Sequence, residues 1–476
     1  MKKLSCLFAF CHLLFSPIFS QKSDDKAMVI SQLDKKLNKY GALSNQIWTY
    51  AEMGYQEVQS SALLQENLKK EGFMVQSGVA DMPTAFTATF GSGKPVIGIL
   101  GEFDALPGLS QDSIPEKKSL GKLAGHACGH HLFGVGSMAA AVAIKDWMTQ
   151  TGQKGTIRFY GTPAEEGGSG KVYLVREGLF NDVDVVLHWH PSDGNSANSA
   201  SSLANKSAKF RFHGISAHAA GAPDRGRSAL DGVEAMNDMV NMMREHIPSA
   251  TRIHYVITNG GKAPNVVPDF AEAYYYVRHP NRDYVASIWT RVENAARGAA
   301  MGTGTTVDWE VIGGVHELLQ NDVLATAMHA NLTRVGGVKY TNAELEFAQK
   351  IQATEGMGIS ELSNSEIIQP SRAEGGSGGS TDVGDVSWAV PTMGLRTATW
   401  VPGTPAHSWQ AVAAGGTGIG RKGMMVAAKA MTLTAMDLYT NPQLIKDAKA
   451  EFDKRKGSYQ YKALVGERKP ALNYRE

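Results

Sequence analysis

VIGILGEFD, residues 96–104, joins a fully apolar run to a short acidic segment. A continuous apolar run of this length is typical of a strand that is covered on both faces of a sheet. Two further strand patterns follow at residues 156–160 and 183–187, and a helical pattern occupies residues 132–148. This alternation predicts an α/β domain with helices on both faces of its sheet.

A different pattern begins near residue 204. Strands and helices follow in the order β-α-β-β-α-β, at residues 209–213, 228–243, 253–258, 272–277, 284–299 and 306–311. That order is typical of a small ferredoxin-like domain. A strand at 392–395 and a helix at 423–439 resume the first pattern, after a glycine-rich loop at 375–380. The small domain is therefore expected to be inserted into the large one.

The first twenty residues resemble a secretory signal peptide. Lys2 and Lys3 precede an apolar run at residues 4–15, and residues 16–20 form a cleavage region that ends at Ser20. The run is too short for a membrane-spanning helix, and its flanks differ from those of such a helix. The alternative is a buried N-terminal helix. A signal peptide predicts a periplasmic or secreted protein.

Cysteine usage agrees with export. Cys6 and Cys11 lie within the predicted signal peptide, so Cys128 is the only cysteine expected in the mature chain. An intramolecular disulfide is then impossible, and a free thiol in an oxidising compartment is a liability. Binding of Cys128 to a metal ion would protect it.

The composition narrows the classes of partner. The 476 residues include 47 lysines and arginines against 46 acidic residues, and 43% of the residues are hydrophobic. The hydrophobic content is typical of a globular protein. The nearly equal numbers of basic and acidic residues give no sign of the basic surface by which proteins bind nucleic acids or anionic membranes. We expect neither a nucleic acid nor a membrane as partner. The expected division is a signal peptide at 1–20, a large domain at 26–204 and 316–476, and the inserted domain at 205–315.

Residues able to bind metal follow several predicted strands of the large domain. Asp104 follows the first strand, Cys128 and His130 precede a helix, Glu165-Glu166 follows the strand at 156–160, and His190 follows the strand at 183–187. Ligands of open α/β sheets bind beyond the carboxyl ends of the strands. Cysteine, histidine and carboxylate are the usual zinc ligands, and several together suit two metal ions that share one water.

Each of these residues alone has an ordinary structural explanation. A lone buried cysteine is more often a small core residue, and a pair of glutamates is more often a solvated surface pair. The argument for a metal site therefore rests on their combination.

Several motifs together resemble the aminoacylase/carboxypeptidase family of co-catalytic metallopeptidases, in the amidohydrolase branch that includes the p-aminobenzoyl-glutamate hydrolases. The resemblance covers nearly the whole mature chain. Its motifs are GHACGH (125–130), GTPAEEGG (161–168), SAHAA (216–220), NVVP (265–268), STDVGDVSW (380–388) and PGTPAH (402–407). The resemblance implies a zinc-peptidase-like mixed-sheet catalytic domain and an inserted ferredoxin-like domain that mediates dimerisation.

The resemblance also implies a role for each matching residue. The five protein ligands of two divalent metal ions, zinc or manganese, would be Cys128, His130, Glu166, His190 and His407. His407 has no other sequence signal, because an isolated loop histidine is usually a surface residue.

The remaining family roles concern catalysis and substrate. Glu165 matches the general base, and Asp104 matches a carboxylate that orients a metal ligand. His218 and Asn265 match residues that contact the scissile carbonyl, His218 reaching across from the partner subunit. Arg278 matches a group that holds the substrate carboxylate.

The resemblance thus implies a metal-dependent amidohydrolase. It would cleave an N-acyl or N-aroyl amino acid, such as p-aminobenzoyl-glutamate, by a metal-activated water with Glu165 as base. A homodimer is expected, or a heteromer with a related subunit. The alternatives are a dipeptidase or aminopeptidase of the same fold, and a non-catalytic metal-binding homologue. One departure is His131, where many relatives in this branch carry aspartate.

Overall fold

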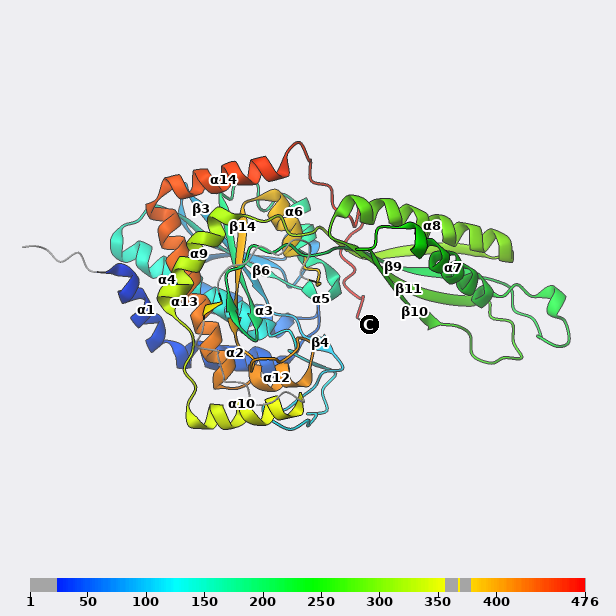
Figure 1. Cartoon of the computed structure of the whole chain (residues 1–476), viewed down its shortest axis with the longest axis horizontal. Coiled ribbons are helices and arrows are strands. Elements are labelled where there is room, and N and C mark those ends of the chain that lie inside the picture. Colours follow the sequence, from blue (N-terminus) through cyan, green and yellow to red (C-terminus); the bar gives the residue numbers. More distant parts are fainter. Residues whose placement is uncertain (1–23, 356–366, 369–377, 476) are drawn as a thin grey trace, which may run out of the picture.

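The computed structural model divides the chain into a larger and a smaller lobe (Figure 1). It describes residues 24–355, 367–368 and 378–475. The predicted signal peptide and half of the predicted glycine-rich loop, residues 375–377, lie outside these residues. Among the described residues, no helix is both long and apolar enough to cross a membrane.

The larger lobe is built on an eight-stranded mixed sheet. Its strands, in spatial order, are β1 (Met74–Ser77), β2 (Phe86–Ser92), β6 (Gly155–Thr162), β3 (Val96–Glu102), β7 (Val185–Ser192), β14 (Thr392–Ala398), β8 (Asn195–Ser196) and β13 (Ile367–Ile368). The four central strands, β6, β3, β7 and β14, are parallel. A short ribbon of β4 (Leu106–Pro107) and β5 (Ala124–Gly125) lies apart from this sheet.

Twelve α-helices accompany the large sheet among the described residues. They are α1 (Asp25–Lys35), α2 (Leu37–Tyr50), α3 (Val58–Lys70), α4 (His130–Thr151), α5 (Glu165–Gly168), α6 (Gly170–Arg176), α9 (Asp322–Val335), α10 (Asn342–Thr354), α11 (Val383–Ala389), α12 (Trp409–Gly415), α13 (Gly418–Thr440) and α14 (Pro442–Lys456). Apolar residues recur at helical spacing throughout residues 26–53, yet the structure divides this stretch at Lys36 into α1 and α2.

Alternate residues of β3 enter two different cores. Ile97 and Ile99 pack into the core that contains α4 and α13, whereas Val96 and Leu100 pack into the core that contains α6 and α11. Successive side chains of a strand point to opposite faces, so a strand that is buried on both faces must be apolar throughout. The predicted α/β architecture, with helices on both faces of the sheet, is confirmed.

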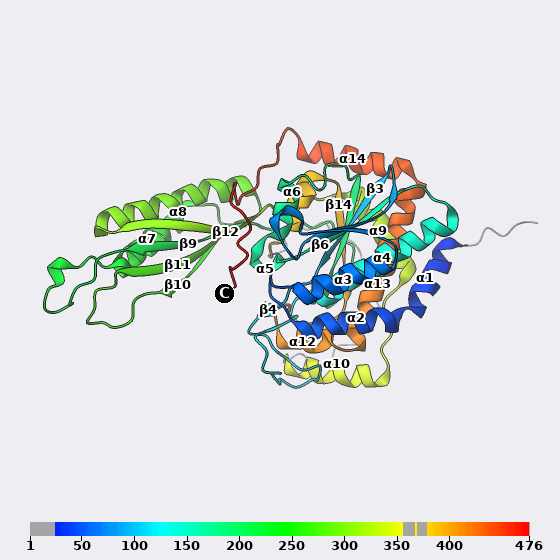
Figure 2. The ribbon, with the colours of Figure 1, turned by 180° about the vertical axis from the view of Figure 1, so that it is seen from behind.

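The smaller lobe is a four-stranded antiparallel sheet with two helices. It contains β9 (Ala204–His213), α7 (Ala229–Met243), β10 (Arg252–Asn259), β11 (Phe270–His279), α8 (Arg282–Thr303) and β12 (Thr306–Val315). Short 3₁₀ turns lie at Pro223–Arg225 and Arg244–His246 of this lobe. A further 3₁₀ turn, Val79–Asp81, belongs to the larger lobe. The spatial order β10-β11-β9-β12 is that of a ferredoxin-like sheet. Both helices pack on β9 and β11, and share one core with these strands (Figure 2).

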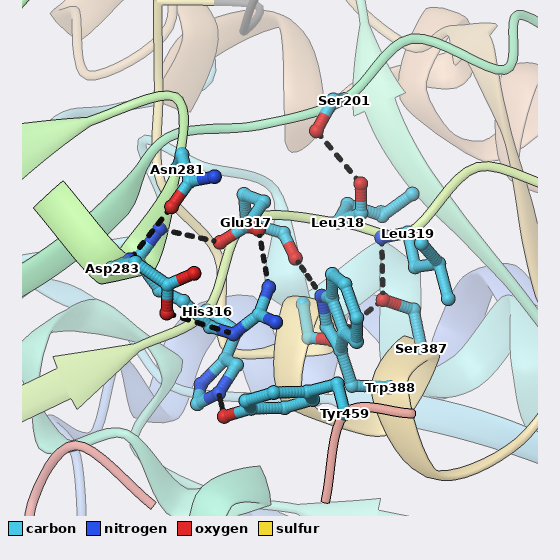
Figure 3. A network of polar contacts seen from close by, with 12 residues as sticks. Ser201, Asn281, Asp283, His316, Glu317, Leu318, Leu319, Ser387, Trp388 and Tyr459 are labelled. Atoms are coloured by element: carbon cyan, nitrogen blue, oxygen red, sulfur yellow. Dashed lines mark hydrogen bonds and ion pairs between the residues drawn. The ribbon is translucent and has the colours of Figure 1, made fainter. Parts of the chain in front are cut away.

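A stacked arginine joins the two lobes. The Arg282 guanidinium, at the start of α8, lies 3.7 Å from the Trp388 ring centroid and 3.6 Å from that of Tyr459. It also donates a hydrogen bond of 2.7 Å to Glu317, while His316 Nε2 lies 2.7 Å from the Tyr459 hydroxyl (Figure 3). A charge that is stacked and paired in this way holds α8 against α11 and the segment after α14.

Candidate metal centre

The carboxyl ends of the parallel strands bring the candidate ligands to one edge of the sheet. Glu102 ends β3, and Asp104 follows it by two residues. Glu165 and Glu166 lie just beyond β6, and His190 lies near the end of β7. Parallel strands end at the same edge, so residues separated by nearly ninety positions of sequence meet there.

Three candidate ligands come from outside these strands. Cys128 and His130 lie at the beginning of α4, where Gly129 adopts a left-handed backbone with φ 75°. Pro191 atoms lie 2.7 Å from where a Gly129 Cβ would be, so a larger residue does not fit between the two. His407 lies in the loop after β14, and its backbone N–H donates to the Ala127 carbonyl at 3.0 Å.

The candidate metal-binding atoms approach one another closely. Cys128 Sγ lies 3.4 Å from His190 Nε2, and His407 Nε2 lies 3.3 Å from Glu166 Oε1. Three groups each have ligand atoms within 4.8 Å of one another: Cys128 with His130 and His190, Cys128 with Glu166 and His407, and Glu102 with His130 and Glu165. The first two groups share Cys128, an arrangement that suits two neighbouring cations bridged by one ligand.

His130 is held between two carboxylates. Its Nδ1 donates to Asp104 Oδ1 at 2.8 Å, and its Nε2 lies 3.1 Å from Glu102 Oε2. Asp104 also accepts the Glu166 backbone N–H through Oδ2 at 2.9 Å. Asp104 thus orients the imidazole ring of His130 and the main chain of Glu166, as expected for a carboxylate that supports metal ligands.

The electrostatics of the cluster differ from one acid to the next. Burial would raise the pKa of Asp104, but the His130 charge and hydrogen bond outweigh burial and lower it to about 2. Burial, together with the Glu102 and Glu166 carboxylates, raises the pKa of Glu165 well above its usual range. Burial and the charge of Glu166 likewise raise the pKa of the Cys128 thiol. Crowded acids of this kind ionise together only where cations compensate them.

Buried donor atoms of the site face one another in a way that fits divalent cations. Among the described residues, Glu102 Oε2, His130 Nε2 and Glu166 Oε1 are buried and make no hydrogen bond. Glu102 Oε2 and His130 Nε2 face each other at 3.1 Å, and Glu166 Oε1 faces His407 Nε2 at 3.3 Å. Buried polar atoms are normally hydrogen-bonded, and bound cations would satisfy these three instead. Together with the Cys128 thiol they form the mixture of sulfur, nitrogen and oxygen donors that zinc accepts.

Sequence reasoning missed Glu102 and Lys171. Glu102 lies two residues before Asp104, so the strand period of two could have indicated a common direction. Lys171 is fully buried, and its Nζ lies 2.7 Å from Glu102 Oε1 and 2.7 Å from Asp382 Oδ1. A lysine at the start of an ordinary helical segment gave no signal of this burial.

Three expected substrate-binding residues lie apart from the cluster. Ala219, next to His218, donates its backbone N–H to the Asn265 carbonyl at 3.1 Å, and both His218 and Asn265 are exposed. Arg278 lies on β11 with its Nε buried and unpaired. Within the described part of the chain, no hydrogen bond or ion pair joins any of the three to the cluster. A contribution from a partner subunit therefore stays a prediction.

His131 points away from the ligands. Its Nε2 lies 3.1 Å from the Gly415 carbonyl, and its ring lies 4.9 Å from the ring of His126, centroid to centroid. Burial lowers the pKa of His131 well below its usual range, so the ring is neutral. His131 therefore lies between α4 and the Gly415 end of α12, and makes no hydrogen bond to a candidate ligand among the described residues.

Comparison with known proteins identifies the family. A peptidase dimerisation domain matches residues 203–302. The p-aminobenzoyl-glutamate hydrolase (B subunit) of Escherichia coli (strain K12) is 41% identical over 445 residues, covering 87% of this chain and 92% of that protein. The Bacillus subtilis YXEP protein, a dinuclear metal-binding peptidase of the M20 family, matches with a TM-score of 0.54 and 17% identity, covering 87% of this chain and 99% of that one. The chain belongs to the M20 peptidase family.

Further relatives of this M20 peptidase are hydrolases too. The Xaa-Arg dipeptidase of Mus musculus is 29% identical, covering 90% of this chain and 92% of that protein. Both the predicted family and the predicted enzyme class are confirmed. The predicted fold class, a mixed-sheet domain with an added dimerisation domain, is confirmed as well.

Proposed function

We propose that this M20 peptidase is a metal-dependent amidohydrolase that cleaves N-acyl or N-aroyl amino acids, with p-aminobenzoyl-glutamate as the first substrate to test. The observation that carries the proposal is the position of Glu165, whose carboxylate lies within 4.8 Å of His130 and Glu102 ligand atoms. A binding protein would need the ligands but no extra carboxylate beside them. The E. coli relative named for this hydrolysis supports the substrate class.

Each residue would contribute a separate task. Bound divalent ions would polarise the amide carbonyl and lower the pKa of an attacking water. Glu165 would take the proton from that water and pass it to the leaving amine. Asp104 would keep the His130 ring in place through the bond to Nδ1. His218 and Asn265 would contact the scissile carbonyl, and Arg278 would bind the substrate carboxylate as a planar bidentate donor.

We propose two divalent metal ions per subunit, zinc or manganese. Cys128, His130, Glu166, His190 and His407 would hold them, with Glu102 close to His130 Nε2. The thiolate of Cys128 favours zinc, because soft sulfur ligands prefer zinc to manganese. Metal analysis of the purified protein tests both the number of ions and their identity.

A panel of substrates tests the reaction. Purified protein loaded with zinc or manganese would be incubated with p-aminobenzoyl-glutamate, other N-acyl amino acids and unblocked dipeptides. Release of p-aminobenzoate or of a free amino acid from the blocked substrates supports the proposal. A protein that binds metal fully but cleaves none of these amides would contradict it.

A dipeptidase is the second candidate function. The supporting observation is the 29% identity to the Xaa-Arg dipeptidase of Mus musculus over 90% of this chain. The same panel separates the two, because a dipeptidase would require the free amino group that an aroyl amino acid lacks.

We propose that the smaller lobe mediates a homodimer, or a heteromer with a related subunit. The match of residues 203–302 to a peptidase dimerisation domain supports this, as does the E. coli relative, whose name describes one subunit of a hydrolase. Light scattering after size-exclusion chromatography would measure the mass, alone and after co-expression with a related subunit.

We also propose export and the predicted domain division. The charged and apolar pattern of residues 1–20 supports a periplasmic or secreted protein. Mass spectrometry of the exported protein should find a new N-terminus at Gln21. The separate core of the smaller lobe supports boundaries near residues 204 and 316.

A further inference from the structure

The segment that carries Glu165 and Glu166 has an uncommon backbone. Ala164 has φ 56° and Ser169 has φ 59°, both in the left-handed region, and Gly167 between them has φ 90°. Residues other than glycine persist in this region only where surrounding contacts hold them. The segment from Ala164 to Ser169 therefore depends on contacts from outside itself.

Two of these contacts come from the chain before α3. Glu57 Oε1 accepts the Ala164 backbone N–H at 2.8 Å, and the Tyr55 hydroxyl donates to the Gly168 carbonyl at 2.8 Å. Glu57 is fully buried and Tyr55 is nearly so. Both ends of the segment are thus fixed by side chains that are themselves buried.

Two more contacts come from the last described residues of the chain. The Tyr474 hydroxyl donates to the Glu166 carbonyl at 2.9 Å, and Arg475 Nη2 donates to the same carbonyl. The Tyr474 ring packs edge-on against Tyr55, with 5.7 Å between centroids. Its hydroxyl oxygen lies 2.3 Å from where a Gly54 Cβ would be, so only glycine at position 54 leaves room for it.

The strap, residues 458–475, brings these two side chains from α14 to the segment. Tyr461 donates to Asp385 at 2.8 Å, and Arg468 donates to Glu310 of β12 at 2.9 Å. Arg176 donates to the carbonyls of Gly466 and Arg468 at 3.1 and 2.7 Å. In Figures 1 and 2 the strap runs between the lobes and ends beside α5. It is anchored along its length before it reaches Glu166.

We propose that Tyr474 and Arg475 are positioning residues for hydrolysis, acting through the main chain of Glu166. The inference rests on the proposed function. The Glu166 N–H is held by Asp104 Oδ2 at 2.9 Å and its carbonyl is held by the strap, so neither adjoining peptide can rotate freely. The Glu166 carboxylate then stays directed at His407, 3.3 Å away, and the neighbouring Glu165 keeps its place beside Glu102 and His130.

The test compares Y474F, R475Q and the double variant with wild type and with N473A. Tyr474→Phe keeps the ring contact with Tyr55 and removes only the hydroxyl donor, whereas the double variant leaves the Glu166 carbonyl without either strap donor. Asn473 is an exposed neighbour and serves as the matched control. Zinc affinity is measured by competition with a chromophoric chelator, and kcat and KM are measured on fully metal-loaded protein with p-aminobenzoyl-glutamate.

We expect the double variant to lose zinc affinity and to lose kcat by roughly ten- to a hundredfold, with KM changed by less than about threefold, because misplaced catalytic groups slow the chemical step. Y474F and R475Q should each show part of that loss, and N473A none. Unchanged zinc affinity and kcat in the double variant would overturn the inference. So would a variant that is only less stable to urea, since that result indicates packing alone.

Failure of the proposed function gives a different result. If wild type cleaves no amide on the panel, the proposed reaction is wrong, while the zinc affinities of the same variants still test the strap. If the double variant does not fold, the zinc affinity and kcat of the single variants Y474F and R475Q test the inference instead.

Discussion

The Nζ of Lys171 lies 2.7 Å from Glu102 Oε1, and both side chains are buried beneath the candidate metal centre. Asp382 Oδ1 lies at the same distance on the other side of Lys171, and Asp382 Oδ2 accepts the Lys171 backbone N–H. The two carboxylates hold the pKa of Lys171 above its usual range despite burial, so the lysine is charged. Lys171 therefore joins β3, α6 and the segment before α11 through one buried cation.

Replacing Lys171 by methionine should destabilise the protein. The change leaves two buried carboxylates without their partner, which typically costs about 3–5 kcal/mol. Urea unfolding of metal-free protein at pH 7 measures the loss. The matched control is K350M, which removes an exposed i,i+4 ion pair with Glu346 and should leave the stability nearly unchanged. A similar loss of unfolding free energy in K171M and K350M would show that the buried ion pairs of Lys171 stabilise the fold no more than an exposed pair does.

Removing the carboxylate of Glu165 should stop hydrolysis without removing metal. Glu165→Gln and Glu165→Ala should lower kcat by at least about 10²-fold, the usual contribution of a general base. Metal content per subunit should stay at the wild-type value. The exposed Glu66 provides the control E66Q, which should keep full activity. Turnover by E165A at the wild-type rate would rule out its role as base.

Chelation should abolish activity, and added metal should restore it. Cys128→Ser should weaken zinc binding more than manganese binding, because a thiolate is a far softer ligand than a hydroxyl group. Activity of the apoprotein is titrated with each metal, for wild type and C128S. Equal shifts for the two metals would argue that Cys128 is not a ligand.

Glu57 should make stability depend on pH. Burial, and then the charge of Asp104, raise the pKa of Glu57 to about 8 from its ordinary value of 4.5. Between these values the native chain holds a proton that the unfolded chain has lost, so stability falls as pH rises through this window. Glu57→Gln cannot ionise and keeps an oxygen for the Ala164 N–H, so it should remove that fall.

The measurement is urea unfolding of both proteins with chelator at pH 5 and pH 9. We expect E57Q to gain stability relative to wild type at pH 9, and to differ from it much less at pH 5. A gain of equal size at both pH values would mean that the glutamate is ionised throughout.

Local sequence patterns were sufficient to predict the fold, because the spacing of apolar residues in each segment indicates which of its faces are buried. The all-apolar strand at 96–100 reports burial on both faces, and the order of elements from 204 to 315 reports one sheet with two helices. The break at Lys36 between α1 and α2 leaves no mark in the sequence, because helical periodicity continues on both sides of it. Among the candidate ligands, His407 came only from the family resemblance, since a loop histidine has no periodic pattern around it.

The sequence by itself determined the family and the kinds of donor at the strand ends, since motifs and strand positions are local properties. Only the tertiary structure decided which side chains from distant parts of the sequence contact these donors. Glu102 and Lys171 lie sixty-nine positions apart, and Tyr474 reaches Glu166 from more than three hundred positions away. Such pairs form because a parallel sheet ends its strands at one edge and a long segment crosses between the lobes. No pattern within any one stretch of sequence records that crossing.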